Sequence, residues 1–236
     1  ADQTVDMIYG DFQTTDGGVT QPKAATCNAA GWCWQNPQPH GNFINAMWGS
    51  SPTDIYAVGD YGTILHHDGT GWTGIKTITS DSLHGVWGAG KNDVFAVGLN
   101  GTIVHYDGTK WSKQTSGTSK NLRGVWGWDG KNVFAVGQNG TILRYDGTTW
   151  SSSASAGFNG LNAVWGSGTG DVYTVGDYGT VLHYTKSCGW STMTTPATNN
   201  LHGLWGSGAK DIYAVGSGGT VLHYDGTQWS STTSGI

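Results

Sequence analysis

The chain has 236 residues, 36% of them hydrophobic, with 40 glycines, 13 tryptophans and no glutamate. This length allows one large all-β domain, and the wealth of glycine, threonine and aromatic residues favours strands and tight turns over helices. A net charge of −5 without a cluster of lysine or arginine argues against nucleic acid as a partner, and no apolar run approaches the roughly 18 residues that a membrane helix needs.

A motif of the form L-x-x-V-W-G recurs every 39 or 40 residues. It starts at Ile44, Leu83, Leu122, Leu161 and Leu201. Thirty-nine residues before Ile44 stands Val5, which opens VDMIYG with Tyr9 in place of the tryptophan. A fixed period near 40 residues is typical of repeat architectures. We therefore expect a single domain over residues 1–236, with repeats that start near 5, 44, 83, 122, 161 and 201, the first of them degenerate.

Each repeat is predicted to form four short strands. In the second full repeat these are LHGVWG over 83–88, DVFAVG over 93–98, GTIVHY over 101–106, and a strand that begins at Trp111. A two-residue turn joins the second and third strands, and an Asp-Gly hairpin turn joins the third and fourth. Four strands in each of six repeats predict a six-bladed β-propeller of four-stranded antiparallel blades, all-β throughout. The recurrent tryptophans are expected to fill the space between blades.

The repeat unit, DVYAVG followed by GTILHYDG and a tryptophan, resembles secreted bacterial propeller repeats and is similar to tectonin-type lectin repeats. The tectonin repeat has a strand ending in an aromatic residue plus glycine, a two-residue turn, an I-Y-x-Y-x-G strand and then tryptophan. The similarity covers nearly the whole chain from Val5. It implies a ring that is commonly non-catalytic and binds glycans at the cell surface, and it carries over no catalytic residue. YDGTTW also resembles the Asp-box of sialidases, but lacks the serine that opens that box.

Several polar positions are constant between repeats, and we expect them to be structural. The Asp-Gly turns hold Asp68, Asp107, Asp146 and Asp225, and a second aspartate precedes the second strand at Asp54, Asp93, Asp171 and Asp211. Both sets are predicted to cap their own turns. Four histidines share one position in the third strand, namely His66, His105, His183 and His223. They lie on different blades, too far apart for a metal site, so we predict hydrogen bonds between blades and no metal.

The positions that differ between repeats gather on one face of the predicted ring, which we call the top face. It carries the turns between the second and third strands and the starts of the first strands. Candidate ligand-binding residues there are Asp60, Tyr61, His84, Asn100, Arg123, Asn139, Asp177, Tyr178 and His202. An aromatic plane and hydrogen-bonding side chains are what a sugar requires. Alternatively, these turns vary only because they are exposed.

Two tryptophans and two cysteines stand outside the repeat pattern. Trp34 and Trp128 are candidate stacking surfaces for a ligand, or else fill a gap at the degenerate first blade. Cys27 and Cys33 flank a predicted hairpin turn, where a disulfide is plausible, and Cys188 is left over. Such a disulfide would favour an oxidising compartment. The opening ADQTV is compatible with a mature end left by signal-peptide cleavage, so we expect a secreted or cell-surface protein.

The leading functional hypothesis is a non-catalytic propeller that binds a glycan or cell-surface polysaccharide on its top face and needs no cofactor. The alternative is a protein-interaction or surface-scaffold module. A polysaccharide lyase could use Tyr61 or Tyr178 with His84 or His202 as acid and base. A hydrolase is disfavoured, because Asp60 and Asp177 would lie on opposite sides of the ring and not within the roughly 5–10 Å that paired carboxylates require.

Overall fold

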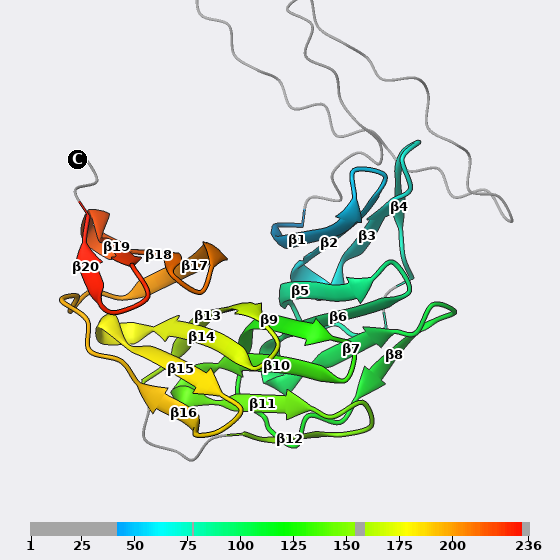
Figure 1. The fold of residues 1–236 in the computed structure, drawn as a ribbon. Coiled ribbons are helices and arrows are strands. Elements are labelled where there is room, and N and C mark those ends of the chain that lie inside the picture. The colour runs from blue at the N-terminus through cyan, green and yellow to red at the C-terminus, as the bar shows by residue number, and fades with distance from the viewer. Residues whose placement is uncertain (1–41, 77, 154–158, 233–236) are drawn as a thin grey trace, which may run out of the picture.

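The computed structural model describes residues 42–76, 78–153 and 159–232. These residues form five four-stranded antiparallel sheets, in each of which the strands lie side by side in chain order. The five sheets follow one another in chain order along an open arc (Figure 1). For these residues, the prediction of an all-β fold of four-stranded antiparallel blades is confirmed. Five blades are described where six were predicted, and the first predicted repeat, 5–41, lies outside the described residues.

We number the blades 1 to 5 in chain order. The first strands, which line the inside of the arc, are β1 (Ile44–Ser51), β5 (Leu83–Gly90), β9 (Leu122–Asp129), β13 (Leu161–Gly168) and β17 (Leu201–Gly208). The second strands are β2 (Asp54–Gly59), β6 (Asp93–Gly98), β10 (Asn132–Gly137), β14 (Asp171–Gly176) and β18 (Asp211–Gly216). The third strands are β3 (Ile64–His67), β7 (Ile103–Tyr106), β11 (Ile142–Tyr145), β15 (Val181–Thr185) and β19 (Val221–Tyr224). The fourth strands are β4 (Trp72–Gly74), β8 (Trp111–Gln114), β12 (Trp150–Ser152), β16 (Gly189–Thr192) and β20 (Trp229–Ser231).

The connection between the second and third strands is longer than the two-residue turn that the sequence predicted. It is a 3-10 turn in every described blade: η1 (Asp60–Gly62), η2 (Leu99–Gly101), η3 (Gln138–Gly140), η4 (Asp177–Gly179) and η5 (Ser217–Gly219). In η2 the Thr102 amide donates to the Leu99 carbonyl at 2.9 Å, and Gly101 has a φ of +69°. Both residues therefore belong to the turn, so the third strand starts at Ile103 and not at Gly101 as predicted.

In blades 1 to 4 the first tryptophan packs against a glycine of the next blade. The four joints are Trp48 on Gly88, Trp87 on Gly127, Trp126 on Gly166, and Trp165 on Gly206. A methyl group at Gly166 would lie 2.3 Å from the Trp126 ring, well inside van der Waals contact. This close approach explains why the repeat pairs tryptophan with glycine: the ring points to one neighbouring blade, and the glycine accepts the ring of the other. The prediction that tryptophans fill the space between blades is confirmed.

In blades 2 to 5 the second tryptophan of the repeat, in the fourth strand, also contacts the preceding blade. Trp150 of blade 3 stands edge-on to Phe95 of blade 2, with ring centroids 5.9 Å apart. Trp190 of blade 4 meets Phe134 of blade 3 in the same way, at 5.5 Å. Phe95 and Phe134 are fully buried. The core therefore lies between blades, and one blade alone would leave both of its faces exposed.

The Asp-Gly turns have the structure that the sequence predicted. Asp107 Oδ1 accepts hydrogen bonds from the Thr109 amide at 2.8 Å and the Lys110 amide at 2.9 Å, and the Thr109 hydroxyl donates to it as well. Gly108 takes a φ of +88°, a conformation that glycine adopts at little cost. We call the side of the blades that carries these turns the bottom face. Its aspartates are held by their own turns, as predicted.

These turns predict a loss of stability in acid. Hydrogen bonds from the Thr109 hydroxyl and the backbone lower the pKa of Asp107 from 3.8 to about 2. Since the folded pKa lies below the unfolded value, the turn's contribution is complete above about pH 4 and is lost as the pH falls towards about 2. In urea unfolding at several pH values, we expect Asp107→Asn to flatten this acid-dependent fall. A profile identical to that of the unchanged protein would contradict the assignment.

Candidate functional site

The repeated histidines bond within their own blades, so the prediction of hydrogen bonds between blades is wrong. His105 Nε2 lies 2.6 Å from Asp93 Oδ1, and the His105 ring stacks on Phe95 with centroids 4.0 Å apart. The other three histidines repeat this contact, pairing as His66 with Asp54, His183 with Asp171 and His223 with Asp211. The reason is the strand register, which pairs Phe95 with His105 on the neighbouring strand. Asp93 stands two residues before Phe95 on β6, and therefore on the same face of the sheet.

The aspartates before the second strand were predicted to cap their own turns. The structure shows that they also bind a side chain of the third strand. Asp211 Oδ1 meets His223, and its Oδ2 accepts from the Ser207 hydroxyl at 2.5 Å. Blade 3 replaces both partners together: Arg144 donates to Asn132 at 2.7 Å and lies over the Phe134 ring at 6.0 Å. This paired change supports a structural role for the position, because each pair makes the same contact between the second and third strands.

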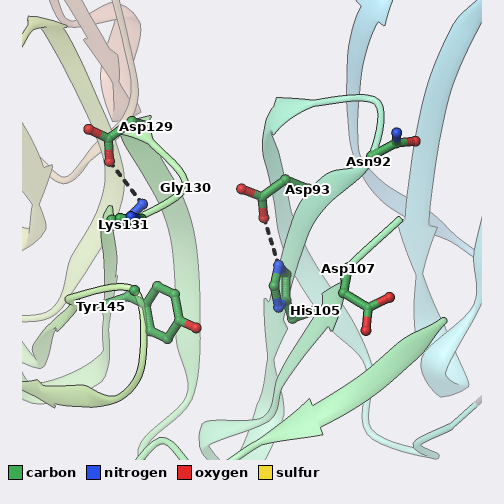
Figure 2. A pocket seen from close by; sticks show the side chains of 9 residues that line it. Asn92, Asp93, His105, Asp107, Asp129, Gly130, Lys131 and Tyr145 are labelled. Carbon is green, nitrogen blue, oxygen red and sulfur yellow. Dashed lines mark hydrogen bonds and ion pairs between the residues drawn. The ribbon is translucent and has the colours of Figure 1, made fainter. Parts of the chain in front are cut away.

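A groove of about 600 Å³ lies on the bottom face between blades 2 and 3 (Figure 2). Three carboxylates line it, Asp93, Asp107 and Asp129, together with Lys131 and Tyr145. Each carboxylate already has a partner: Asp93 bonds His105, Asp107 bonds its own turn, and Asp129 accepts from the Lys131 amide at 2.8 Å. Among the described residues, no group of three His, Cys or Asp side chains is placed to hold a metal ion. The groove is thus lined by groups that hold the fold.

On the top face, two blades share a cluster that the other described blades lack. Asn45 donates to Asp60 Oδ1 at 3.0 Å in blade 1, and Asn162 donates to Asp177 Oδ1 at 3.1 Å in blade 4. Tyr61 and Tyr178 follow these aspartates directly in η1 and η4. We call each set an Asn–Asp–Tyr cluster: Asn45, Asp60 and Tyr61, and Asn162, Asp177 and Tyr178. The aspartates and tyrosines were predicted as site residues, and the two asparagines stand at the starts of first strands, which were predicted to lie on the same face.

Each asparagine also ties its cluster to the next blade. Asn45 donates to the Leu83 carbonyl at 3.0 Å, and Asn162 donates to the Leu201 carbonyl at 2.7 Å. Both stand second in their first strand, the position that holds His84, Arg123 and His202 in the other blades. The sequence therefore places the two asparagines at the same position as three predicted site residues. The asparagine therefore fixes the aspartate carboxylate in place on rigid strands.

Tyr61 and Tyr178 are both exposed and held in a left-handed backbone conformation. Their φ angles are +54° and +56°, and 71% and 74% of their surface is accessible. The same turn position holds Asn100, Asn139 and Gly218 elsewhere, residue types that adopt this conformation more readily. Tyrosine in this conformation costs stability, and such costs gather at functional sites. The fold does not require these tyrosines, because neighbouring blades make the same turn without them.

The remaining top-face candidates belong to blades 2, 3 and 5. Arg123 Nη1 donates to Asn162 Oδ1, which joins blade 3 to the cluster of blade 4. Burial lowers the pKa of His84, with Asp60 opposing and Arg123 adding to the shift. His202 bonds Ser217 within blade 5 at 2.8 Å. Asn100 donates to Asp81 at 2.8 Å.

Trp128 lies away from the top face, on β9 near the bottom turns. It contacts the rings of Trp126 and Phe134, with centroids 6.5 and 5.8 Å away, and Lys186 Nζ lies 5.8 Å from its ring centroid. It is half-buried among side chains of blades 3 and 4, so it fills a gap there and not at the degenerate first blade. Trp34, Cys27 and Cys33 lie outside the described residues, and Cys188 is a free, exposed thiol.

Comparison of the structure with solved proteins finds β-propellers. The chain superposes on YCF48 bound to D1 peptide with a TM-score of 0.64 and 16% identity, over 81% of this chain and 67% of that one. It superposes on the WD40 propeller domain of Doa1 with a TM-score of 0.69 and 12% identity, over 82% and 68% of the two chains. For U3-55K the values are 0.71, 9%, 82% and 66%. The chain thus spans about two thirds of the length of these structures.

The fold and its repeated blades define the class of this protein as a β-propeller. At these identities the likeness extends to the fold alone. No protein family matches the sequence, and no curated protein matches it either. Within the described ranges, none of the helices has the length and hydropathy needed to cross a membrane.

Proposed function

We propose that this protein is a non-catalytic binding module that takes carbohydrate on its top face, at the two Asn–Asp–Tyr clusters. The observation that carries the proposal is the pair of exposed tyrosines, Tyr61 and Tyr178, held in an unfavourable backbone conformation beside a fixed carboxylate. A tyrosine ring offers a plane to the apolar face of a sugar. The neighbouring aspartate and asparagine can exchange hydrogen bonds with its hydroxyls.

The repetition of the cluster also supports a glycan ligand. Blades 1 and 4 carry the same three residue types, and two other blades stand between them in the chain. Two equal sites on one rigid body suit a ligand that presents the same unit repeatedly, such as a polysaccharide, because a second contact then adds affinity at little further cost. The resemblance of the repeats to secreted bacterial propellers and tectonin-type lectins supports the same class of ligand, and a site of action outside the cell.

A peptide or protein partner is the second candidate. Arg123 and His84 lie on the top face between the clusters, and Arg123 would attract an acidic segment. One structural neighbour is YCF48 bound to a peptide.

For either ligand, we propose that the complete ring has six blades. The described residues form five of them, and residues 5–41 would supply the sixth.

Replacing the tyrosines by asparagine tests the proposed site. We expect Tyr61→Asn and Tyr178→Asn each to stabilise the protein by about 1 kcal/mol, because asparagine tolerates the left-handed conformation better. Each single change should remove one of two equal binding sites, and the double change should abolish binding. Glycan-array screening, followed by calorimetric titration with the sugar found, measures both number and affinity of sites.

The control is Asp146→Asn in the Asp-Gly turn of blade 3, on the bottom face, which should leave binding unchanged. Glycan binding that survives the double change would contradict the site. Failure of every glycan to bind, together with saturable binding of acidic peptides that Arg123→Ala abolishes, would favour the second candidate.

A further inference from the structure

Blade 5 exposes a face that every other described blade buries. Tyr213 and Val215 on β18 are 39% and 47% accessible, whereas Tyr173 and Val175, at the same positions of blade 4, are 2% and 0% accessible. Trp205 stands beside them, since β17 pairs Trp205 with Tyr213, and 63% of its surface is accessible. The three side chains form one apolar patch on the side of blade 5 that faces away from blade 4.

Blade 1 exposes the complementary face at the other end of the arc (Figure 1). Ile44 and Met47 on β1 are 42% and 58% accessible, whereas Leu83 and Val86, at the same positions of blade 2, are 0% and 8% accessible. In the other described blades, the side chains at these positions pack against the preceding blade, as Leu83 and Val86 do against blade 1. The two ends of the arc therefore present the two halves of the joint that already occurs four times within the structure.

The tryptophan–glycine contact specifies what fits between these faces. Each described joint places a tryptophan ring on the glycine of the following blade, as Trp165 does on Gly206. Gly49 of blade 1 receives no such ring from the described residues, since the three atoms nearest to a methyl group there come from blade 1 itself. An occupant must offer a glycine to Trp205 and an aromatic ring to Gly49.

Residues 5–41 carry both groups in the correct order and spacing. Tyr9 and Gly10 stand 39 residues before Trp48 and Gly49, which is the period of the repeat, and the segment of 37 residues has about the length of one blade. We propose that residues 5–41 dock between blades 5 and 1 of the same chain, with Gly10 beneath Trp205 and the Tyr9 ring on Gly49. The inference rests on the six-bladed ring proposed above and does not depend on the ligand.

A second copy of the chain is the competing occupant. Trp205 of one copy could meet Gly49 of another, and repetition of that contact would give open chains of molecules, because the two faces differ. Docking within one chain is favoured because the segment is already tethered to blade 1. The effective concentration of a segment linked in this way is far above that of a separate molecule.

Photo-crosslinking of the full chain tests the proposal. With benzoylphenylalanine in place of Trp205, irradiation at low micromolar concentration should join position 205 to a peptide within residues 5–41 of the same molecule. Gly10→Val should lower the yield several-fold, because a branched side chain would lie under the ring, whereas Gly18→Val should not. Benzoylphenylalanine in place of Trp126 is the positive control and should crosslink near Gly166.

Crosslinks between molecules, from position 205 to β1 or β2, would overturn the proposal in favour of a second copy. Absence of any crosslink to residues 5–41, with the control at position 126 reacting, would also overturn it. A thermal measurement checks the result independently: Trp205→Ala should lower Tm about as much as Trp126→Ala does, and an unchanged Tm would contradict coverage of this face. Loss of glycan binding alone would leave these outcomes unaffected, so the two proposals fail separately.

Discussion

Gly137→Ala is expected to destabilise the protein by about 3 kcal/mol, at the upper end of what added volume costs in a packed core. A methyl group at Gly137 would lie 2.1 Å from the Asn121 carbonyl oxygen and 2.8 Å from the Leu122 Cα. Both are backbone atoms, so no side-chain rotation can relieve the clash. The φ of Gly137 is −175°, which any residue adopts, so the cost comes from the contact and not from the backbone angle.

Gly90→Ala is the matched control for this change. Gly90 ends β5 in the neighbouring blade, and a methyl group there would meet nothing within 4 Å. We expect its unfolding free energy to stay within about 0.5 kcal/mol of the unchanged protein. Urea unfolding followed by far-ultraviolet circular dichroism measures both. Equal stability of the two variants would mean that β9 and β10 do not approach each other as closely as the structure has them.

Trp126→Ala is expected to cost about 3–5 kcal/mol, the usual range for removing a large aromatic ring from a core. The Trp126 ring covers Gly166 of the next blade, and glycine has no side chain that could fill the space left behind. Trp128 and Trp87, whose centroids lie 6.5 Å from Trp126, would lose a ring contact as well. The loss therefore falls on the joint between blades 3 and 4.

Trp126→Phe provides a graded comparison, since phenylalanine keeps one ring in the same place. We expect it to cost less than half as much as the alanine change, as read from the midpoint of chemical unfolding. A phenylalanine variant as unstable as the alanine variant would point to a specific need for the indole and not to filled volume. An alanine variant as stable as the unchanged protein would contradict the joint itself.

Most of the blade could be predicted from the sequence because its signals are local. Alternation in segments such as DVFAVG marks strands, and Asp-Gly marks the turn before Trp111. The role of the first tryptophan was also predictable, since a repeated ring beside a repeated glycine implies close contact between neighbours. The turn at Gly101 was misjudged because two-residue and 3-10 turns share the same glycine, and only its hydrogen bonds distinguish them.

The repeat pattern alone did not identify the aspartate partners of the repeated histidines. Asp93 and His105 lie 12 residues apart in the chain, on adjacent strands, and the register that brings them together depends on the turn length between them. One signal was present in the sequence: blade 3 changes both members at once, to Asn132 and Arg144. Two positions that change together are typical of direct contact, and this pair indicated the correct partner.

The top face could be located from the sequence, but the contacts within it could not. Asp60 and Tyr61 stood out because they differ between repeats and recur only as Asp177 and Tyr178. The contribution of Asn45 depends on where a first-strand side chain meets a turn 15 residues later, which requires the register of the paired strands. The left-handed conformation of the tyrosines, which singles them out among the turns, also emerged only from the backbone angles.

Amide chemical-shift mapping with a bound sugar tests most directly whether the residues that differ between blades are the ones that bind. The spectrum of the labelled full chain would be recorded during titration with the sugar identified on the array. We expect the largest shifts at η1 and η4, at Tyr61 and Tyr178, and no shifts at the bottom-face turns of Asp107 and Asp146. Shifts that gather at those Asp-Gly turns, with η1 and η4 unaffected, would contradict the proposed binding face.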